Sequence, residues 1–206
     1  MIPRIIHQFW AEGDPPEVAS WRTLEGWIHV LWSLDNLPEW FRPSEQWNHP
    51  EKYTVPYHNP SERLYANILR FELLGEMGGV WADCDMELIG DLNQLLVGDC
   101  NLAMFGQQIG TGFIAAKAHH PFVESCRHTL REMERPVAVA SMWAASQAPV
   151  DDVTFLEPEL VYPGPYWDVE TDIRPKVLMN HPRKRPCRDC AEKRQPCRGC
   201  GSASVS

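Results

Sequence analysis

The chain has 206 residues, of which 44% are hydrophobic and 23% charged, a balance that excludes wholesale disorder and suits one globular domain with or without an appendage. The formal net charge is −9, but residues 181–206 are basic, with 7 Lys or Arg against 2 Asp or Glu, so the preceding body is strongly acidic and disfavours nucleic acid. No apolar run reaches the roughly 20 residues of a membrane helix, and the first residues lack a signal-peptide pattern. We therefore expect a cytoplasmic protein.

The first sixty residues predict two strands separated by a short helix. Residues 4–10 are rich in β-formers and predict a strand, and residues 27–32 predict a second one. A short helix is expected over residues 17–24. Residues 39–60 are rich in Pro, Trp and His, and we expect a loop there with at most one helical turn.

The clearest predicted helix begins at Ser61. Its apolar residues recur at helical spacing on a broad face, while Arg63, Asn67 and Arg70 share another stripe. The Gly78-Gly79 pair is expected to end the helix, because glycine readily adopts the left-handed cap conformation.

Five further elements follow in the second half of the chain. We expect strands over residues 102–106, 112–116 and 153–156, and helices over residues 121–133 and 137–147. Strands that alternate with helices indicate an α/β fold.

Two acidic residues come directly after a predicted buried strand. Residues 80–82 form that strand, and Asp83-Cys84-Asp85 follows it. On an extended backbone both carboxylates would lie on one side, with Cys84 packed on the other. Paired carboxylates at the carboxyl end of a strand suit Mg²⁺ or Mn²⁺ bound to phosphates. The alternative is a solvated turn that happens to contain two acids.

An ordered set of sequence blocks resembles one known family. Residues 66–85 contain an Arg-bearing helix, a Gly-Gly pair, an aromatic strand and Asp-x-Asp, and they resemble the signature of glycosyltransferases with a DXD sugar-binding region. That family includes capsular-polysaccharide enzymes and fungal mannosyltransferases. Further blocks in the same order resemble the family at residues 2–10, 31–38, 110–121 and 153–163.

The resemblance implies a GT-A-like nucleotide-sugar-binding domain over residues 1–181, with a mixed, mainly parallel sheet. It implies transfer of a sugar from a nucleotide-sugar donor to a hydroxyl acceptor, such as a saccharide, with Mn²⁺ or Mg²⁺ and with retention at the anomeric carbon. A metal held by carboxylates would stabilise the charge that develops on the leaving diphosphate.

The resemblance also assigns roles to individual residues. Asp83, Asp85 and Arg70 would be catalytic, with Asp85 the main metal ligand and Asp83 a second one or a contact to ribose or sugar. The donor would be bound by Trp10, Asn67, Arg70, Asp83 and Gly112, and His181 would complete the metal shell.

Several of these positions have simpler alternatives. The family carries Asp where this chain has Asn67. Trp10 would stack on the base, but it could also be a core residue. His7 shares a strand face with apolar neighbours, so we expect a buried, hydrogen-bonded structural histidine.

The basic residues 182–206 form a Cys-rich appendage. Cys187, Cys190, Cys197 and Cys200 make two Cys-x-x-Cys pairs, which suit a structural tetrahedral Zn²⁺. Reduced thiols in a disordered tail, or two disulfides, are the alternatives. The Arg and Lys residues around the pairs suit an anionic partner.

Two other functions are compatible with the sequence. In the first, the chain is a non-catalytic, nucleic-acid-associated binding module that acts through the zinc-knuckle tail. In the second, Asp83 and Asp85 serve a metal-dependent phosphohydrolase, although the additional His or Asp ligands at the expected spacing are missing.

Overall fold

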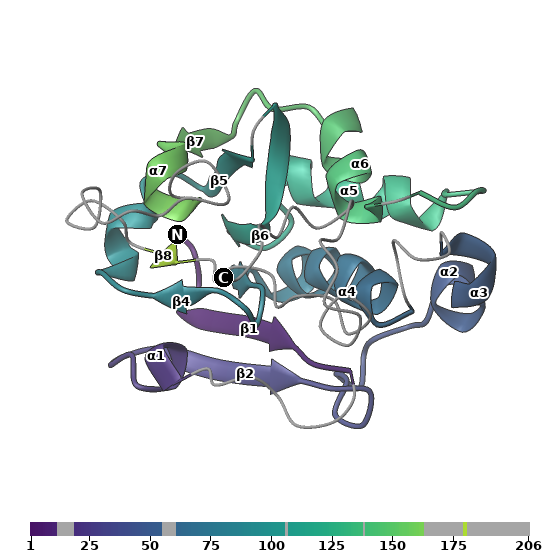
Figure 1. Cartoon of the computed structure of the whole chain (residues 1–206), viewed down its shortest axis with the longest axis horizontal. Coiled ribbons are helices and arrows are strands. Elements are labelled where there is room, and N and C mark those ends of the chain that lie inside the picture. The colour runs from purple at the N-terminus through teal and green to yellow at the C-terminus, as the bar shows by residue number, and fades with distance from the viewer. Residues whose placement is uncertain (12–18, 55–60, 106, 138, 163–178, 181–206) are drawn as a thin grey trace, which may run out of the picture.

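The computed structural model describes residues 1–11, 19–54, 61–105, 107–137, 139–162 and 179–180 (Figure 1). Its centre is a six-stranded sheet in the order β2-β1-β3-β6-β5-β7. The strands are β1 (Ile5–Phe9), β2 (Ile28–Trp32), β3 (Gly79–Ala82), β5 (Cys100–Phe105), β6 (Gln108–Ala116) and β7 (Thr154–Leu156). A separate two-stranded sheet pairs β4 (Glu87–Leu88) with β8 (Met179–Asn180).

The larger sheet is mixed and mainly parallel. β1 runs parallel to β2 and β3, and β5 runs parallel to β7, whereas β6 is antiparallel to its neighbours β3 and β5. The α/β class and the sheet type that the sequence predicts are therefore confirmed.

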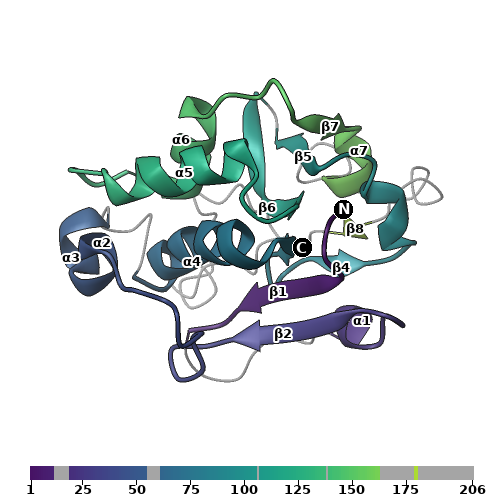
Figure 2. The same cartoon turned by 180° about the vertical axis from the view of Figure 1, so that it is seen from behind.

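Helices cover both faces of the sheet, giving three layers (Figures 1 and 2). One face is covered by α4 (Ser61–Met77), α5 (Pro121–Arg131) and α6 (Ala140–Gln147), and the other by α1 (Ala19–Arg22), the 3₁₀ helix η1 (Leu92–Leu95) and α7 (Pro158–Val161). Alternate residues of β3 divide between the two cores, because Trp81 packs in the first while Val80 and Ala82 pack in the second.

The predicted strands and helices are present, whereas six short elements were not expected. α2 (Glu45–Asn48) and α3 (Pro50–Tyr53) lie in the segment predicted to be mainly loop. Ser44 caps α2 by accepting from the Trp47 N–H at 3.3 Å, and Pro50 opens α3. The elements β4, η1, α7 and β8 were not predicted, since none exceeds four residues. None of the described helices combines the length and apolar character needed to span a bilayer.

Several sequence predictions fall on other parts of the chain. His181 and the four tail cysteines Cys187, Cys190, Cys197 and Cys200 lie outside the described residues. The zinc site and the boundary of the domain near residue 181 therefore stay predictions.

His7 is a buried structural histidine, as the sequence predicts. Its side chain is fully buried, its Nδ1 accepts from Trp32 Nε1 at 3.1 Å, and its Nε2 lies 2.9 Å from the Gly78 carbonyl oxygen. Since Nδ1 is an acceptor, Nε2 carries the proton and donates it, and the ring is neutral. Burial lowers the pKa of His7 to about 4, partly offset by the bond to Gly78.

We expect acid to destabilise the fold through His7. The unfolded chain takes up the proton near the ordinary histidine pKa of 6.5 and the folded chain only near about 4, so this contribution is complete above pH 6.5 and is lost as the pH falls toward 4. The difference amounts to roughly 3 kcal/mol. Urea unfolding between pH 4 and 7 should show that His7→Gln has a weaker pH dependence, while the exposed His128→Gln keeps the wild-type slope. Equal slopes in all three proteins would contradict the prediction.

Glu72 joins α4 to α5 through a buried ion pair network. Its side chain is 5% exposed and accepts from Arg127 Nε at 2.7 Å and from Arg131 Nε and Nη2 at 2.8 and 2.7 Å. Glu76 accepts from the same Arg127 at 2.7 Å but is 38% exposed.

We expect Glu72→Gln to lower the free energy of unfolding by about 2 kcal/mol, because it leaves two arginines without a buried charge partner. Glu76→Gln, which removes a solvent-screened contact to the same arginine, should change it by less than about 1 kcal/mol. Chemical denaturation of both variants measures the difference, and equal losses would argue against the buried network.

Candidate active site

The acidic pair lies where the carboxyl ends of β1 and β3 meet the first half of β6. Asp83 follows β3, and its N–H donates to the Gly112 carbonyl at 2.8 Å. The Met86 N–H donates to the Asp83 carbonyl at 2.9 Å, which closes a turn over residues 83–86. The expectation of an extended Asp83-Cys84-Asp85 is therefore wrong, because this turn bends the chain directly after β3. Asp83 is one-third exposed and Asp85 is exposed.

Two donors hold one oxygen of Asp83 in place. Arg70 Nη2 donates to Asp83 Oδ1 at 2.9 Å, and Trp81 Nε1 donates to the same oxygen at 2.8 Å. The guanidinium of Arg70 also lies over the Trp81 ring at 5.0 Å, and its Nη1 donates to the Thr111 carbonyl. Arg70 thus positions Asp83 from the protein interior, because the Arg70 side chain is only 4% exposed.

Asn67 belongs to a buried hydrogen-bond chain that crosses three elements. Ser141 Oγ of α6 donates to Asn67 Oδ1 at 2.8 Å, and it lies 2.8 Å from Thr111 Oγ1 of β6. Asn67, Ser141 and Thr111 are all buried. Asn67 and Arg70, which the sequence places on one stripe of the helix, are therefore both linked to Thr111.

Gly112 leaves room for the acidic side chain. A Cβ at this position would lie 3.1 Å from Asp83 Oδ2 and 3.2 Å from Tyr162 Oη. Tyr162 is partly buried next to it, and its hydroxyl accepts from the Phe113 N–H at 3.2 Å. Burial, and then the charge of Asp83, raise the pKa of Tyr162 far above its ordinary value, so the phenol stays protonated.

Trp10 lies at the same edge of the sheet and is not a core residue. It is 37% exposed, and it directly follows Phe9, whose carbonyl accepts from Cys84 Sγ at 3.2 Å. An exposed indole beside the acidic turn is available for stacking. Cys84 is buried, as predicted, and burial raises the pKa of its thiol to about 12, with the charge of Asp83 adding to the effect.

The carboxylates of Asp83 and Asp85 have the hard oxygen ligands that Mg²⁺ and Mn²⁺ prefer. Within the described residues there is no cluster of three or more His, Cys, Asp or Glu side chains arranged to hold a metal. The donor set fits a cation held by one or two carboxylates and completed by water and substrate phosphates, which is the usual arrangement for Mg²⁺.

The sequence did not predict five residues that the structure brings to the site: Gln8, Trp81, Thr111, Ser141 and Tyr162. Tyr162 belongs to residues 153–163, which resemble the family, but the neighbouring sequence does not indicate that it lies next to Asp83. Ser141 comes from an Ala-rich helix without a motif. Gln8 is the fourth of the five residues of β1, and its Nε2 donates to the Asp83 carbonyl at 3.4 Å.

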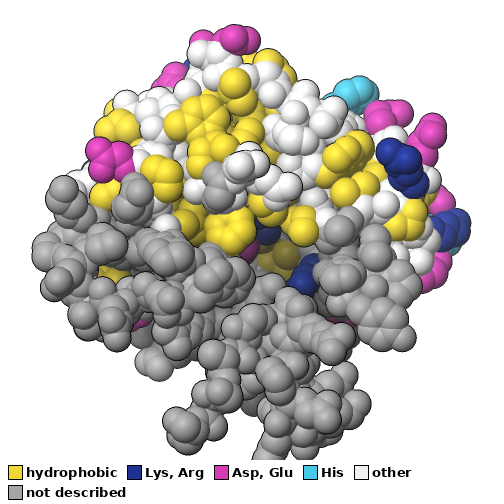
Figure 3. All heavy atoms as spheres, turned by 45° about the horizontal axis from the view of Figure 1, so that its top comes forward, with side chains coloured by type: hydrophobic (Ala, Val, Ile, Leu, Met, Phe, Trp, Pro, Cys, Tyr) yellow, Lys and Arg dark blue, Asp and Glu magenta, His cyan; other side chains and the backbone are white. Residues whose placement is uncertain are grey.

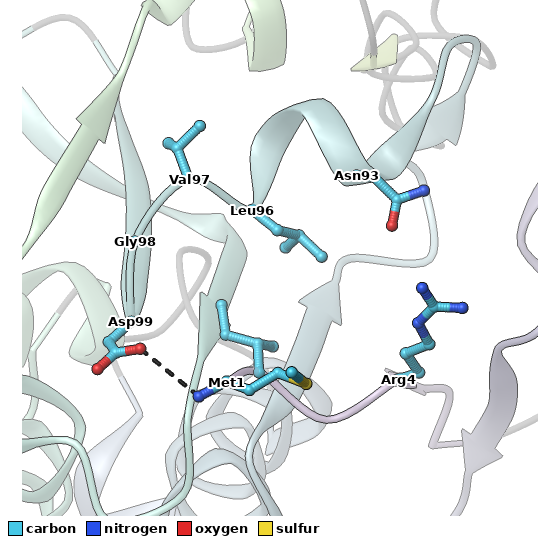
Figure 4. A pocket seen from close by; sticks show the side chains of 8 residues that line it. Met1, Arg4, Asn93, Leu96, Val97, Gly98 and Asp99 are labelled. Carbon is cyan, nitrogen blue, oxygen red and sulfur yellow. Dashed lines mark ion pairs between the residues drawn. The ribbon is translucent and has the colours of Figure 1, made fainter.

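A hollow lies near the opposite end of β1 from the acidic turn (Figure 4). It is lined by Met1, Arg4, Leu96 and Asp99 among others, and the amino group of Met1 lies 3.7 Å from Asp99 Oδ1. Arg4 and Trp10 are separated by the length of β1, about 20 Å for an extended segment. The acidic turn and this hollow are therefore separate places on the molecule.

Comparison with known proteins gives two similarities. Over 140 residues, the chain is 27% identical to Inositol phosphoceramide mannosyltransferase 1 of Schizosaccharomyces pombe, a match that covers 63% of this chain and 43% of that protein. This confirms the resemblance to glycosyltransferases, although the chain spans less than half the length of that relative. A solved structure titled PaToxG Glycosyltransferase superposes with a TM-score of 0.47 and 13% identity, covering 72% of this chain and 68% of the other. No family model matches the chain.

Proposed function

We propose that the chain is a glycosyltransferase that moves a sugar from a nucleotide-sugar donor to a hydroxyl acceptor. The observation that carries the proposal is Asp83, held by Arg70 and Trp81 beside the exposed Asp85 at the carboxyl end of β3. Ligands of open α/β sheets bind at that end of the strands. The similarity to a mannosyltransferase in sequence supports the same reaction class.

Each residue of the site has a distinct role in this proposal. Asp85 and Asp83 would hold Mn²⁺ or Mg²⁺, which supplies positive charge to the departing diphosphate. Arg70 and Trp81 fix Asp83 Oδ1, so that the other oxygen, Oδ2, stays on the side of Gly112. Trp10 offers an exposed ring to the base of the donor. We also propose that the transfer retains the configuration at the anomeric carbon, and this part rests on the family resemblance alone.

A donor screen with the full chain tests the function. Thermal unfolding with Mn²⁺ and UDP-, GDP- or CDP-sugars should show a rise in Tm for donors of one base, because a ligand that binds the folded state stabilises it by mass action. Slow donor hydrolysis, or transfer to a saccharide, should accompany the shift. If no nucleotide sugar changes the Tm or is hydrolysed, and Asp85→Ala alters no metal or donor binding, the proposal fails.

The nucleic-acid module is the second candidate, because residues 182–206 are basic and Cys-rich. The described surface visible in Figure 3 carries few basic side chains, next to acidic ones, and offers no broad cationic face there. Salt-sensitive binding to RNA or DNA that is lost on removal of residues 182–206, without any donor binding, would favour this alternative.

A further inference from the structure

Trp21 of α1 is a buried residue whose indole N–H contacts the end of the acidic turn. The residue is 1% exposed, and its Nε1 donates to the Met86 carbonyl at 2.7 Å. The indole N–H is the only polar group of a tryptophan side chain, and a buried donor needs a partner. Met86 is the last residue of the turn over residues 83–86 and immediately precedes β4. The indole therefore holds the peptide group through which the chain leaves the turn.

A second contact from α1 holds β4, the strand that follows the turn. The Leu88 N–H donates to Ser20 Oγ at 3.2 Å. Trp21 also packs in the same core as Met86 and Leu88. Two neighbouring residues of α1 thus hold the exit of the turn and the strand after it. Because α1 and α4 lie on opposite faces of the sheet, these contacts act on the turn from the side opposite Arg70.

The entry to the turn is held by β1 and β6. The Asp83 N–H donates to the Gly112 carbonyl at 2.8 Å, and the Asp83 carbonyl accepts from Gln8 Nε2 at 3.4 Å. Asp85 lies between this entry and the exit at Met86, and it is exposed. Since the backbone is held at both ends, the position of Asp85 relative to Asp83 depends on the exit as much as on the entry.

We propose that Trp21 is a positioning residue for the metal site, whose indole N–H holds the exit of the turn so that Asp83 and Asp85 bind one divalent cation together. The inference rests on the proposed function and deepens it. Two carboxylates can share a cation only while they are held within about 0.5 Å of the productive geometry. Loss of a group that orients metal ligands typically weakens metal binding by about 10–100-fold. A tryptophan that only filled the core would affect stability and leave the metal site unchanged.

Mn²⁺ binding to the full chain tests this role without a donor and without an activity assay. Electron paramagnetic resonance of the free ion gives the dissociation constant, and the binding that is lost in Asp85→Ala defines the site. Trp21→Phe keeps a buried aromatic ring and removes the N–H. It should raise the dissociation constant of that site by about tenfold.

Trp32→Phe is the matched control for a general effect on the fold. Trp32 is also buried, and its Nε1 donates to His7 Nδ1 at 3.1 Å. Both substitutions truncate a buried indole and remove one hydrogen bond, so both should lower the Tm by a similar amount. Only Trp21→Phe should change the dissociation constant for Mn²⁺. Wild-type binding in Trp21→Phe, or an equal increase in both variants, would overturn the inference.

Ser20→Ala decides the question if Trp21→Phe does not fold. It removes the partly buried hydroxyl that accepts from the Leu88 N–H, and it should raise the same dissociation constant by severalfold with little change in Tm. In that case, wild-type binding in Ser20→Ala would contradict the role of α1.

Failure of the proposed function gives a different result. If the wild-type chain has no Mn²⁺ binding that Asp85→Ala removes, the proposed metal site fails and the inference falls with it. If wild type has that site and Trp21→Phe binds Mn²⁺ equally well, the metal site stands and only the role of Trp21 is overturned.

Discussion

Alanine at Asp83 should lower both activity and stability, whereas alanine at Asp85 should lower activity alone. Removing either carboxylate is expected to reduce transfer by about 10²–10³-fold, the usual effect of losing one group that supports charge at the transition state. Asp83→Ala additionally leaves the guanidinium of Arg70, which is 4% exposed, without its charge partner. That loss should destabilise the fold by about 3 kcal/mol. Asp85 is exposed, and its replacement should change stability by less than about 1 kcal/mol.

Steady-state transfer and urea unfolding of the same preparations measure both effects. Asp35→Ala, an exposed acid in the turn after β2, is the matched control and should behave as wild type in both assays. An Asp85→Ala variant with full transfer would remove that residue from the proposed metal site. Wild-type stability of Asp83→Ala would show that Arg70 does not depend on the carboxylate.

The general location of the site could be predicted because its signals are local. The apolar spacing of α4, the Gly78-Gly79 pair and the strand that follows bring Asp83 to the carboxyl end of β3 without any knowledge of distant contacts. The exposure of Trp10 could not be predicted. The chain has nine tryptophans, and the sequence around them does not show which ones the fold covers.

Which side chains contact one another within the site depends on segments that are far apart in the sequence. The role of Arg70 in holding the donor stays a prediction. The sequence did not indicate that its guanidinium contacts both Asp83 and the Thr111 carbonyl, which is 41 residues away in the chain. Ser141 is 74 residues from Asn67, on a helix whose sequence shows no motif. At residues 83–86 the sequence left a turn and an extended strand end both open, because Asp is common at the first position of a turn; the hydrogen bond from the Met86 N–H to the Asp83 carbonyl decides for the turn.

Gly79 is the position where a single methyl group should damage the fold most. Its φ is +107°, a conformation that side chains rarely adopt, and an added Cβ would lie 2.5 Å from the carbonyl oxygen of Ile5 and 3.2 Å from His7 Nε2. The carbonyl belongs to the backbone of β1, the strand that pairs with β3, so it cannot move away without disturbing the register Ile6↔Val80. Strain at positive φ and overpacking together should lower the free energy of unfolding by about 4 kcal/mol in Gly79→Ala.

Gly75 in the same block provides the control for this prediction. A Cβ there would meet Glu124 Oε1 at 3.1 Å and Arg127 Nη1 at 3.2 Å, which are the ends of flexible side chains, and the residue lies inside α4. Gly75→Ala gains helix propensity of up to about 1 kcal/mol and should leave stability close to that of wild type. Urea unfolding of the two variants should therefore separate them by several kcal/mol. Similar stabilities would mean that the chain enters β3 by a backbone path that does not need glycine at position 79, and the close approach of β1 to β3 at this position would lose its explanation.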